Sequence, residues 1–428
     1  MESRAGYGRV CVASRDISRH QLVLDDDPVG LSPTQDSPPI CLTCLTPLDG
    51  SSWYLCDCGF PLCSSSCSSS EQHRPEHQVF TRSGVVARGA RDYPLVMPIR
   101  LLTALEAGND TLRDRVGRLM DHNQEREREE EGWQWVEERV VRPLLRLETS
   151  WTREEIQRCV GVFRTNACTT QLPPSGEAEA GQVRVLYPSM AILSHSCSPN
   201  TQARYRPDHG LSMTATRDIR RGEEITNTYT TLWGSSVHRK KDFANWFFDC
   251  SCERCEDGED LGSELDSWKC WQSSCRGVLS LSFCQLWPGI PAFPSWQCNL
   301  CHHSATADDI KRRESSLLSS LQVMGQHRGF STNVLSHHFQ KIDPTDENCV
   351  GKYEEFIKEN EEVLQSNHWI LTQCRVNIID VFENFGKLNL EMLRIVAEQG
   401  QQLLKLFDVL RLGSLALRGY ILYYWRLV

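Results

Sequence analysis

Cysteine and histidine residues occur in this chain at spacings that suit metal binding. The region from 41 to 77 carries four short-spaced pairs of candidate ligands, namely Cys41 and Cys44, Cys56 and Cys58, Cys63 and Cys67, and His73 and His77. Structural zinc takes four thiolate or imidazole ligands in a tetrahedron, and one tight turn or one helical turn supplies each pair. Eight such ligands predict two zinc sites in a region that is poor in periodic apolar residues.

A second group of cysteines lies in the stretch FFDCSCERC, which contains Cys250, Cys252 and Cys255. Three cysteines leave a tetrahedral site one ligand short, so the fourth ligand must come from a distant part of the chain. Cys197, in the stretch SHSCSPN that begins at Ser194, is the natural candidate. The sequence therefore predicts a third zinc site that joins two distant segments.

The stretch SHSCSPN has a second interpretation, because its serine, histidine and cysteine could form a nucleophilic catalyst. The context argues against a hydrolase, since the chain has no G-x-S-x-G elbow. A histidine directly beside a serine also cannot generally reach the serine hydroxyl as a base. Cys197 is therefore better interpreted as a zinc thiolate than as a nucleophile.

A third group combines Cys270 and Cys275 with Cys298 and Cys301, at the looser spacing of a ribbon-like zinc site. With this group included, the sequence predicts three or four zinc ions per chain. The other cysteines are scattered singly, and burial in the core is the better interpretation for them.

Composition and charge restrict the cellular setting and the partners. The N-terminus has no apolar core of a signal peptide, and no apolar run reaches the length of a membrane span. We therefore expect no membrane association and a location in the nucleus and/or the cytoplasm. Thiols stay reduced there, which favours metal ligands over disulfides for the 20 cysteines. The net charge of −10 argues against nucleic acid as the main ligand.

The elements that must position these ligands alternate between β and α character along the chain. Short strands are expected over residues 1–30 and again over 183–232, where β-branched residues alternate with turn signals. Amphipathic helical patterns cover about 95–165 and run from about 311 to the last residue. The chain therefore combines β and α segments with three cysteine-rich regions.

Several motifs in this order resemble the SMYD family, in which a SET domain is split by a MYND zinc finger. They are GYG near the N-terminus, the cysteine-rich finger, RTNACT, HSCSPN, GEEIT-x-x-Y and CxCxxC. The order of the parts resembles the arthropod-type members of the family.

The resemblance implies an α+β fold, with a mostly-β SET domain split by the finger and a helical insert. A post-SET zinc region and a C-terminal α-helical, TPR-like domain follow. The implied domain ranges are 1–32 and 184–249 for the two parts of the SET domain, 41–80 for the finger, 81–183 for the helical insert, 250–310 for the post-SET and ribbon-like zinc regions, and 311–428 for the C-terminal helices.

The resemblance also implies how the finger ligands are shared. One ion would take Cys41, Cys44, Cys63 and Cys67, and the other Cys56, Cys58, His73 and His77. The chain departs from the family at two places in the second set. One residue separates Cys56 from Cys58 where the family usually has two, and His77 stands where the family usually has cysteine.

The activity implied by the resemblance is S-adenosylmethionine-dependent methylation of a lysine in a histone or non-histone protein. Tyr229 matches the catalytic tyrosine, and Trp246 and Phe248 match residues of the lysine channel. The implied cofactor-binding residues are Gly6, Gly8, Asn166, Ser194, His195 and Phe248.

Ser194 is the departure that bears on activity, because the family has asparagine at this position. Serine offers one short hydroxyl where asparagine offers a donor and an acceptor. The loss of one polar contact costs about 0.5–1.5 kcal/mol, so we expect roughly tenfold weaker cofactor binding. The alternative is a catalytically weak or inactive SET and MYND adaptor that recruits protein partners in transcriptional regulation. Its finger would bind proline-containing peptides.

Overall fold

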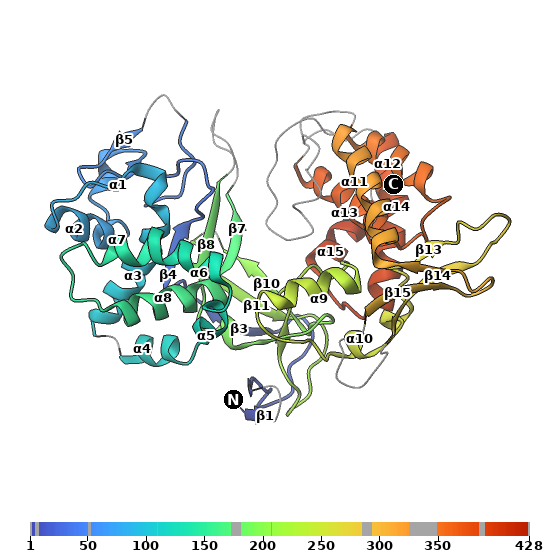
Figure 1. Ribbon diagram of the computed structural model, residues 1–428, viewed down its shortest axis with the longest axis horizontal. Helices are drawn as coiled ribbons and strands as arrows, with labels where there is room; N and C mark the ends of the chain where they lie inside the picture. Colours follow the sequence, from blue (N-terminus) through green and yellow to red (C-terminus); the bar gives the residue numbers. More distant parts are fainter. Residues whose placement is uncertain are drawn as a thin grey trace. The chain divides into compact units, whose positions relative to one another are not determined.

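The computed structural model forms two compact units. Unit 1 comprises residues 1–23, 194–202 and 214–428, and unit 2 comprises 24–193 and 203–213. Figure 1 shows the elements of both units. The structure describes residues 2–4, 8–49, 53–108, 110–172, 181–206, 208–284, 293–324, 349–384 and 390–426.

The finger occupies one end of unit 2 and consists of short elements between the cysteine-bearing turns (Figure 1). These elements are the antiparallel strands β5 (Tyr54–Leu55) and β6 (Pro61–Leu62), and the helices α1 (Ser65–Ser68) and α2 (Arg74–Arg82). Its small apolar core contains aliphatic side chains such as Leu62 and the rings of Phe60 and Phe80, which stand edge to face at 5.3 Å between centroids. Tyr93 packs against Phe60 from the following helix.

The rest of unit 2 packs helices against a three-stranded antiparallel sheet with strand order β4-β8-β7. The strands are β4 (Gly30–Pro33), β7 (Cys168–Gln171) and β8 (Gln182–Leu186). The helices are α3 (Tyr93–Glu106), α4 (Asp110–Gly117), α5 (Asn123–Arg126), α6 (Glu130–Val136), a π-helical turn (Glu137–Val141), α7 (Arg142–Leu144) and α8 (Arg153–Asn166), with a 3-10 turn (Gly89–Asp92) before α3.

A capping box sets the start of α8, and a close contact sets the distance of α3 from β4. Thr152 and Glu155 form a capping box that starts α8, which satisfies backbone N–H groups that have no helical partner. The helix α3 lies so close to β4 that a side chain at Gly30 would collide with Met97.

The β-rich core of unit 1 is assembled from segments far apart in the sequence. In the N-terminal segment β1 (Glu2–Arg4) pairs with β2 (Gly8–Val10), and bridges then join Val12 to Glu224 and Ile17 to Ile219. The 3-10 turn Met190–Ile192 comes before β9, and the short strands β9 (Ser194–His195) and β12 (Thr226–Asn227) pair in parallel. A further sheet has the order β10-β11-β3, from Thr201–Tyr205, Leu211–Ala215 and Leu22–Asp26, and most residues of each strand belong to unit 2.

The Asn200 side chain links the turn before β10 to β12 and the residues before it. Its Oδ1 accepts a hydrogen bond from the Thr226 N–H at 2.8 Å, and its Nδ2 donates to the Glu224 carbonyl at 2.7 Å. The turn after SHSCSP is therefore fastened to the strand that leads to Tyr229.

After β12 the chain forms a cysteine-rich region. The helices α9 (Ser236–Ala244) and α10 (Glu253–Glu256) and the 3-10 turn Asp260–Gly262 come first. A four-stranded antiparallel sheet follows in sequence order, with β13 (Trp268–Lys269), β14 (Val278–Cys284), β15 (Phe293–Cys298) and β16 (Ser304–Thr306).

The C-terminal part of unit 1 is helical, as expected. Its helices are α11 (Ala307–Met324), α12 (Cys349–Asn360), α13 (Trp369–Asn384), α14 (Leu390–Val409) and α15 (Ala416–Trp425). Their buried side chains share one core with the four-stranded sheet. None of the described helices is long and apolar enough to cross a membrane.

The loop between α14 and α15 contacts Thr216, which follows β11. Gly413 has φ +58°, and a Cβ there would lie 2.6 Å from the Thr216 carbonyl oxygen, so only glycine fits. The next residue, Ser414, donates its N–H to the same carbonyl at 2.9 Å.

The predicted α+β class is confirmed, with four cysteine and histidine clusters among the described residues and a helical C-terminal region. The domain limits given above stay predictions. The predicted loop over 171–182 begins in β7, and its residues 173–180 lie outside the described residues, as does Gly6.

Candidate metal centres and active site

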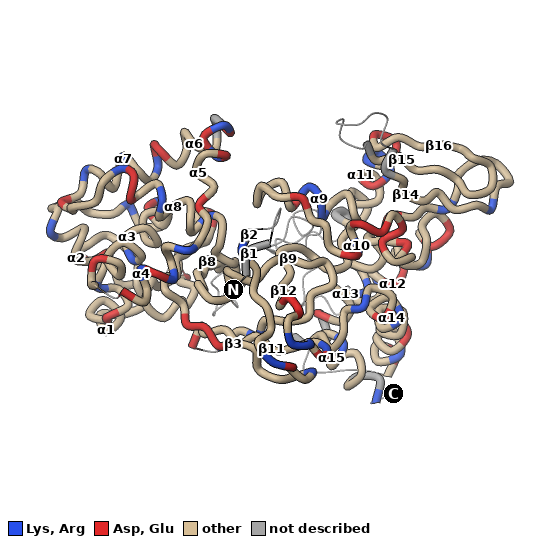
Figure 2. The backbone as a smooth tube through the Cα atoms, turned by 90° about the horizontal axis from the view of Figure 1, so that it is seen from below, with Lys and Arg blue, Asp and Glu red and all other residues tan. Residues whose placement is uncertain are grey.

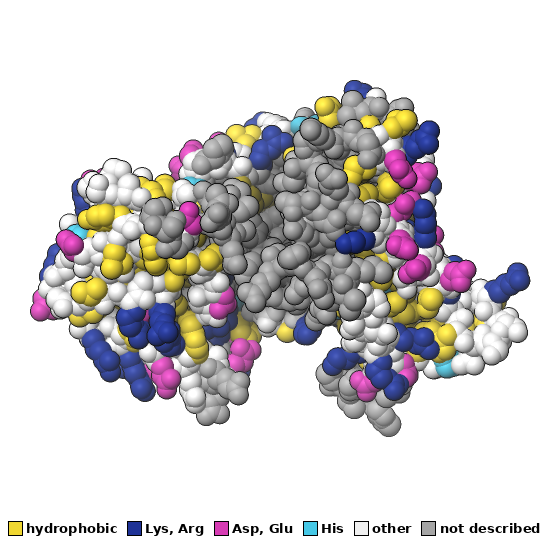
Figure 3. All heavy atoms as spheres, turned by 90° about the horizontal axis from the view of Figure 1, so that it is seen from above, with side chains coloured by type: hydrophobic (Ala, Val, Ile, Leu, Met, Phe, Trp, Pro, Cys, Tyr) yellow, Lys and Arg dark blue, Asp and Glu magenta, His cyan; other side chains and the backbone are white. Residues whose placement is uncertain are grey.

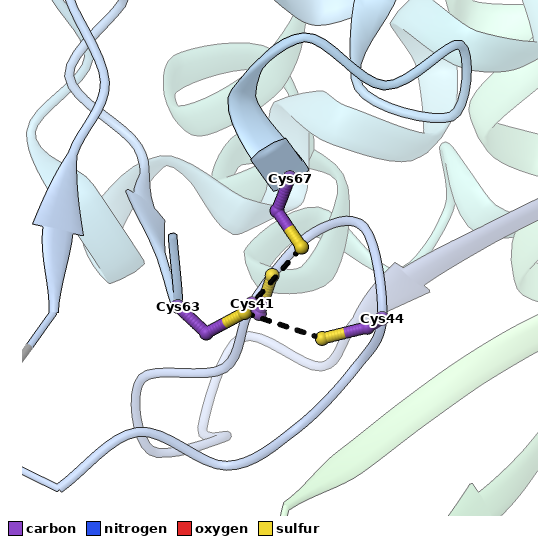
Figure 4. Close-up of side chains that lie close together, drawn as sticks. All are labelled: Cys41, Cys44, Cys63 and Cys67. Carbon is purple, nitrogen blue, oxygen red and sulfur yellow. Dashed lines mark hydrogen bonds between the residues drawn. The ribbon is translucent and has the colours of Figure 1, made fainter. Parts of the chain in front are cut away.

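The first finger cluster contains the four cysteines that the resemblance assigned to one ion (Figure 4). Cys41 and Cys44 lie in the loop before β5, Cys63 follows β6, and Cys67 lies on α1. All four Sγ atoms lie within 4.8 Å of one another. The Cys63–Cys67 and Cys44–Cys63 Sγ pairs are 3.4 and 3.6 Å apart. Tetrahedral zinc with Zn–S bonds of about 2.3 Å needs sulfur atoms about 3.8 Å apart, so the donor set fits zinc.

The second finger cluster brings together Cys56, Cys58, His73 and His77, again as the resemblance implied. The Cys56 Sγ lies 3.2 Å from the His77 Nδ1, and the Cys58 Sγ lies 3.3 Å from the His73 Nε2. The histidine in place of the usual cysteine therefore reaches the site, and it offers Nδ1 where His73 offers Nε2.

Glu76 contacts a ligand of this second cluster, and sequence reasoning missed it. It is fully buried, and its Oε1 lies 3.0 Å from the His73 Nδ1. Burial opposes its ionisation, but the charge of Arg100 and hydrogen bonds from His73 and Arg100 lower the pKa of Glu76. A carboxylate on Nδ1–H leaves the Nε2 lone pair of His73 directed at a metal. The available signal was the position of Glu76 three residues after His73 on a helix.

Arg100, on α3, links this cluster to the rest of unit 2. Its Nε donates to the Glu76 Oε2 at 3.0 Å. Its Nη1 and Nη2 donate to the carbonyl oxygens of Leu31 on β4 and Leu42 in the first ligand loop, at 2.7 and 2.8 Å. One guanidinium therefore connects both finger sites to the sheet.

The third cluster brings Cys197 together with Cys250, Cys252 and Cys255, with all four Sγ atoms within 4.8 Å of one another. Cys197 follows β9 and is fully buried, whereas the other three cysteines lie at α10 and in the segment before it. The Sγ atoms of Cys197 and Cys255 are 3.6 Å apart.

The fourth cluster lies at one end of the four-stranded sheet and contains Cys270, Cys275, Cys298 and Cys301. The Sγ atoms of Cys270 and Cys301 are 3.6 Å apart, and those of Cys275 and Cys298 are 3.7 Å apart. Cys270 and Cys275 follow β13, whereas Cys298 ends β15 and Cys301 lies in the turn after it, which is the arrangement of a zinc ribbon.

His195 lies between the third cluster and Tyr229. Its Nδ1 accepts a hydrogen bond from the Tyr229 backbone N–H at 2.9 Å, and its Nε2 lies 3.3 Å from the Cys197 Sγ. Because Nδ1 is an acceptor, the proton of the neutral ring must sit on Nε2, where it is donated to sulfur. Burial lowers the pKa of His195 to about 4, which agrees with a neutral ring. Both ring nitrogens therefore serve internal hydrogen bonds.

Aromatic rings surround Tyr229 in unit 1. Trp246 and Phe248 lie at 6.0 and 6.2 Å from its ring centroid, and Phe248 stands edge to face. The buried Phe243 on α9 lies with its ring tilted against those of His195 and Phe248, at 4.7 and 5.2 Å between centroids. Sequence reasoning missed Phe243, because a helical phenylalanine has no distinguishing signal. Burial, with a smaller contribution from Cys11, raises the pKa of Tyr229 to about 12, so its hydroxyl stays protonated at neutral pH.

The remaining predicted cofactor residues lie as follows. Ser194 pairs with Thr226 in the β9–β12 ladder, and Gly8 begins β2. Asn166 ends α8 in unit 2, where its Nδ2 donates to the carbonyls of Met120 at 2.8 Å and Val162 at 2.7 Å. Their contact with a cofactor stays a prediction.

The fold and this arrangement define a class of protein. The chain belongs to the SET domain family, whose model matches residues 8–230, just over half of the chain. Within that class the chain is related to the SMYD family, so the predicted resemblance is confirmed.

Two relatives illustrate the relationship. The "SET domain-containing protein SmydA-8, isoform A" of Drosophila melanogaster is 30% identical over 312 residues, 69% of this chain and 63% of that protein. The "Histone-lysine N-methyltransferase SMYD3" of Homo sapiens is 35% identical over 173 residues, 39% of this chain and 40% of that protein. The chain thus spans less than two thirds of the length of these relatives.

Proposed function

We propose that this protein is an S-adenosylmethionine-dependent protein-lysine N-methyltransferase. The observation that carries the proposal is the arrangement around Tyr229, whose backbone is held by His195 and whose ring lies among Trp246 and Phe248. The relationship to proteins named histone-lysine N-methyltransferases supports it. Gly6, Gly8, Asn166, Ser194, His195 and Phe248 would hold the cofactor.

The chemistry of these side chains suits methyl transfer to an amine. A lysine side chain has a reference pKa of about 10.4 and must lose its proton before its nitrogen can attack. Aromatic, poorly hydrated walls such as Trp246 and Phe248 disfavour the charged ammonium and so favour the reactive amine. Because the pKa of Tyr229 is raised, its hydroxyl is a neutral hydrogen-bonding group that orients the reactants. Bound S-adenosylmethionine would supply the methyl group.

The substrate would be a protein with an accessible lysine, histone or non-histone. Acidic residues gather along the chain around α10, close in sequence to Phe248 (Figure 2). Glu253, Glu256 and Glu259 are exposed there. Their negative charge would attract a basic peptide segment, at a strength that falls with added salt. We place this activity in the nucleus and/or the cytoplasm.

Direct binding and one substitution test the enzymatic proposal. We expect S-adenosylmethionine to bind the full chain in isothermal titration calorimetry. Tyr229→Phe is expected to keep that binding and to lose methyl transfer, measured with labelled cofactor and histone peptides. Tyr420→Phe, at an exposed site on α15, is the matched control. No detectable cofactor binding at millimolar concentration would sink the proposal.

We also propose that zinc occupies all four clusters, because each presents four sulfur or nitrogen donors within 4.8 Å. Structural zinc supplies folding free energy of about 10–16 kcal/mol in small domains. Chelation is therefore expected to unfold the finger. Elemental analysis of the purified protein should find about four zinc ions per chain. Fewer than three would contradict the grouping of Cys197 with the later cysteines.

A second candidate function, the peptide-binding adaptor, is favoured by the surface of the finger. Trp53, Tyr54, Leu55 and Val86 expose 44%, 40%, 65% and 64% of their surfaces. Hydrophobic side chains also gather on the finger end of the face seen in Figure 3. Exposed apolar clusters of this kind mark binding surfaces.

Fluorescence polarisation with a proline-containing peptide tests the adaptor. Leu55→Asp is expected to abolish peptide binding, whereas Leu300→Asp, equally exposed but in the fourth cluster, should leave it unchanged. Equal binding by both variants would place the peptide elsewhere on the protein.

A further inference from the structure

Three buried charged side chains lie beside the third cysteine cluster. Arg239 on α9, Arg254 on α10 and Asp260 expose 0%, 1% and 6% of their surfaces. The Asp260 carboxylate accepts two hydrogen bonds from Arg254, at 2.9 and 2.8 Å, and two from Arg239, at 2.7 and 3.2 Å. Two guanidinium groups thus hold one carboxylate in a fixed geometry, with one positive charge left over.

Arg254 also reaches the segments that carry the candidate active site. Its Nη1 donates to the carbonyl oxygen of Cys197 at 2.8 Å and to that of Leu232 at 2.7 Å. Cys197 comes two residues after His195, and Leu232 comes three residues after Tyr229. Because Arg254 itself lies between Cys252 and Cys255, one side chain joins three segments that are distant in sequence.

Arg239 adds a fourth segment to this arrangement. Its Nη1 donates to the Gly234 carbonyl at 2.7 Å, in the turn before α9. The helix α9 ends at Ala244, shortly before Trp246 and Phe248. The segments that carry the histidine, the tyrosine and the two aromatic walls therefore all converge on Asp260.

Arginine is required for this set of contacts. The Arg254 guanidinium uses three of its nitrogens in one plane, with Nε and Nη2 on Asp260 and Nη1 on two carbonyl oxygens. Lysine has a single charged nitrogen and cannot span the carboxylate and both carbonyls. Arg254→Lys would keep the charge and lose the geometry.

We propose that Arg254, oriented by Asp260 and Arg239, is a positioning residue for methyl transfer. It fixes the backbone after Tyr229 relative to the backbone after His195, and it acts through these segments. The inference rests on the proposed methyltransferase function. A small displacement of a reacting group costs a large factor in rate, so the tyrosine segment needs support of this rigidity.

The test compares Arg254→Lys with the wild type in the full, zinc-loaded chain. We expect kcat for methylation of a histone peptide to fall about 10- to 100-fold. We expect KM for the peptide to stay within about threefold and the zinc content to stay unchanged. A purely structural role would lower the melting temperature and leave kcat of the folded protein at the wild-type value. Arg312→Lys, at an exposed ion pair on α11, is the matched control.

A milder variant keeps the test decisive if Arg254→Lys does not fold. The Ser263 hydroxyl donates to the Asp260 Oδ2 at 3.0 Å and accepts a longer hydrogen bond from the Leu265 N–H at 3.4 Å. Ser263→Ala removes these two bonds and leaves the four arginine bonds to Asp260 in place. We expect its kcat to fall about two- to fivefold. Wild-type kcat in every variant that folds would overturn the inference and leave the proposed function standing. A wild-type protein that binds no S-adenosylmethionine would instead refute the proposed function itself.

Discussion

Replacing Glu314 by glutamine is expected to make the stability of the protein less dependent on pH. Glu314 lies on α11, and its Oε1 accepts a hydrogen bond from the Trp369 Nε1 on α13 at 2.8 Å. Burial raises the pKa of Glu314 to about 7; the Trp369 hydrogen bond opposes this rise, and the charge of Asp266 adds to it. The carboxyl group therefore prefers its neutral form in the folded protein.

The sign and size of the effect follow from this pKa. In the unfolded chain Glu314 titrates near its ordinary value of 4.5. Between pH 4.5 and about 7 the folded state binds more protons than the unfolded state, so the free energy of unfolding falls as pH rises through this window. At about 1.4 kcal/mol for each unit of pKa difference, the loss reaches up to about 3 kcal/mol above pH 7. Glutamine accepts the same hydrogen bond and escapes this loss.

Urea unfolding at pH 5 and pH 8, followed by circular dichroism at saturating zinc, measures the difference between wild type and Glu314→Gln. We expect the advantage of the variant to grow by about 1–3 kcal/mol between the two pH values. Because the variant is compared with the wild type at the same pH, the contribution of the cysteine clusters to the free energy of unfolding is the same in both and cancels. Glu355→Gln, exposed on α12, controls for the loss of one carboxylate. An advantage of equal size at both pH values would refute the reasoning.

Two further substitutions test the metal and cofactor sites. Glu76→Gln removes the carboxylate from a buried ion pair with Arg100, so the free energy of unfolding should fall by about 3–5 kcal/mol. Zinc should also pass to a chromogenic chelator faster than from the wild type. A change in the free energy of unfolding below about 1 kcal/mol would contradict a buried charge at this position. Ser194→Asn restores the donor and acceptor of asparagine, so calorimetry should show S-adenosylmethionine bound up to about tenfold more tightly. Unchanged affinity would show that the side chain at 194 does not contact the cofactor.

Ligand spacing made the cysteine clusters predictable from the sequence. Structural zinc takes four ligands, so three closely spaced cysteines imply a fourth ligand elsewhere in the chain. The Cys197 Sγ lies within 4.8 Å of the other three sulfur atoms. The sharing of ligands between the two finger sites could not be read from spacing, because each pair could join any other. The family resemblance supplied that pairing, and the two finger clusters agree with it.

The buried charges around these clusters had no comparable signal. Arg254 bonds to the carbonyl of Cys197 across 57 residues, and Arg100 reaches Glu76 across 24. A buried arginine cannot be told from an exposed one in a sequence. The backbone carbonyl oxygens that accept its hydrogen bonds belong to residues of any type, so they leave no pattern. Only the fold shows which of the charged residues are enclosed.

The position of His195 changes how the stretch SHSCSPN is understood. The resemblance assigned His195 to the cofactor, yet its ring nitrogens bond to the Tyr229 N–H and to the Cys197 Sγ. Arg254 makes a parallel link from the Cys197 carbonyl to Leu232, on the other side of Tyr229. Two independent side chains therefore connect the tyrosine segment to the same cysteine. A metal bound by that cysteine would hold both links in place, so its loss should disable the tyrosine segment while the helices of the C-terminal region keep their own core.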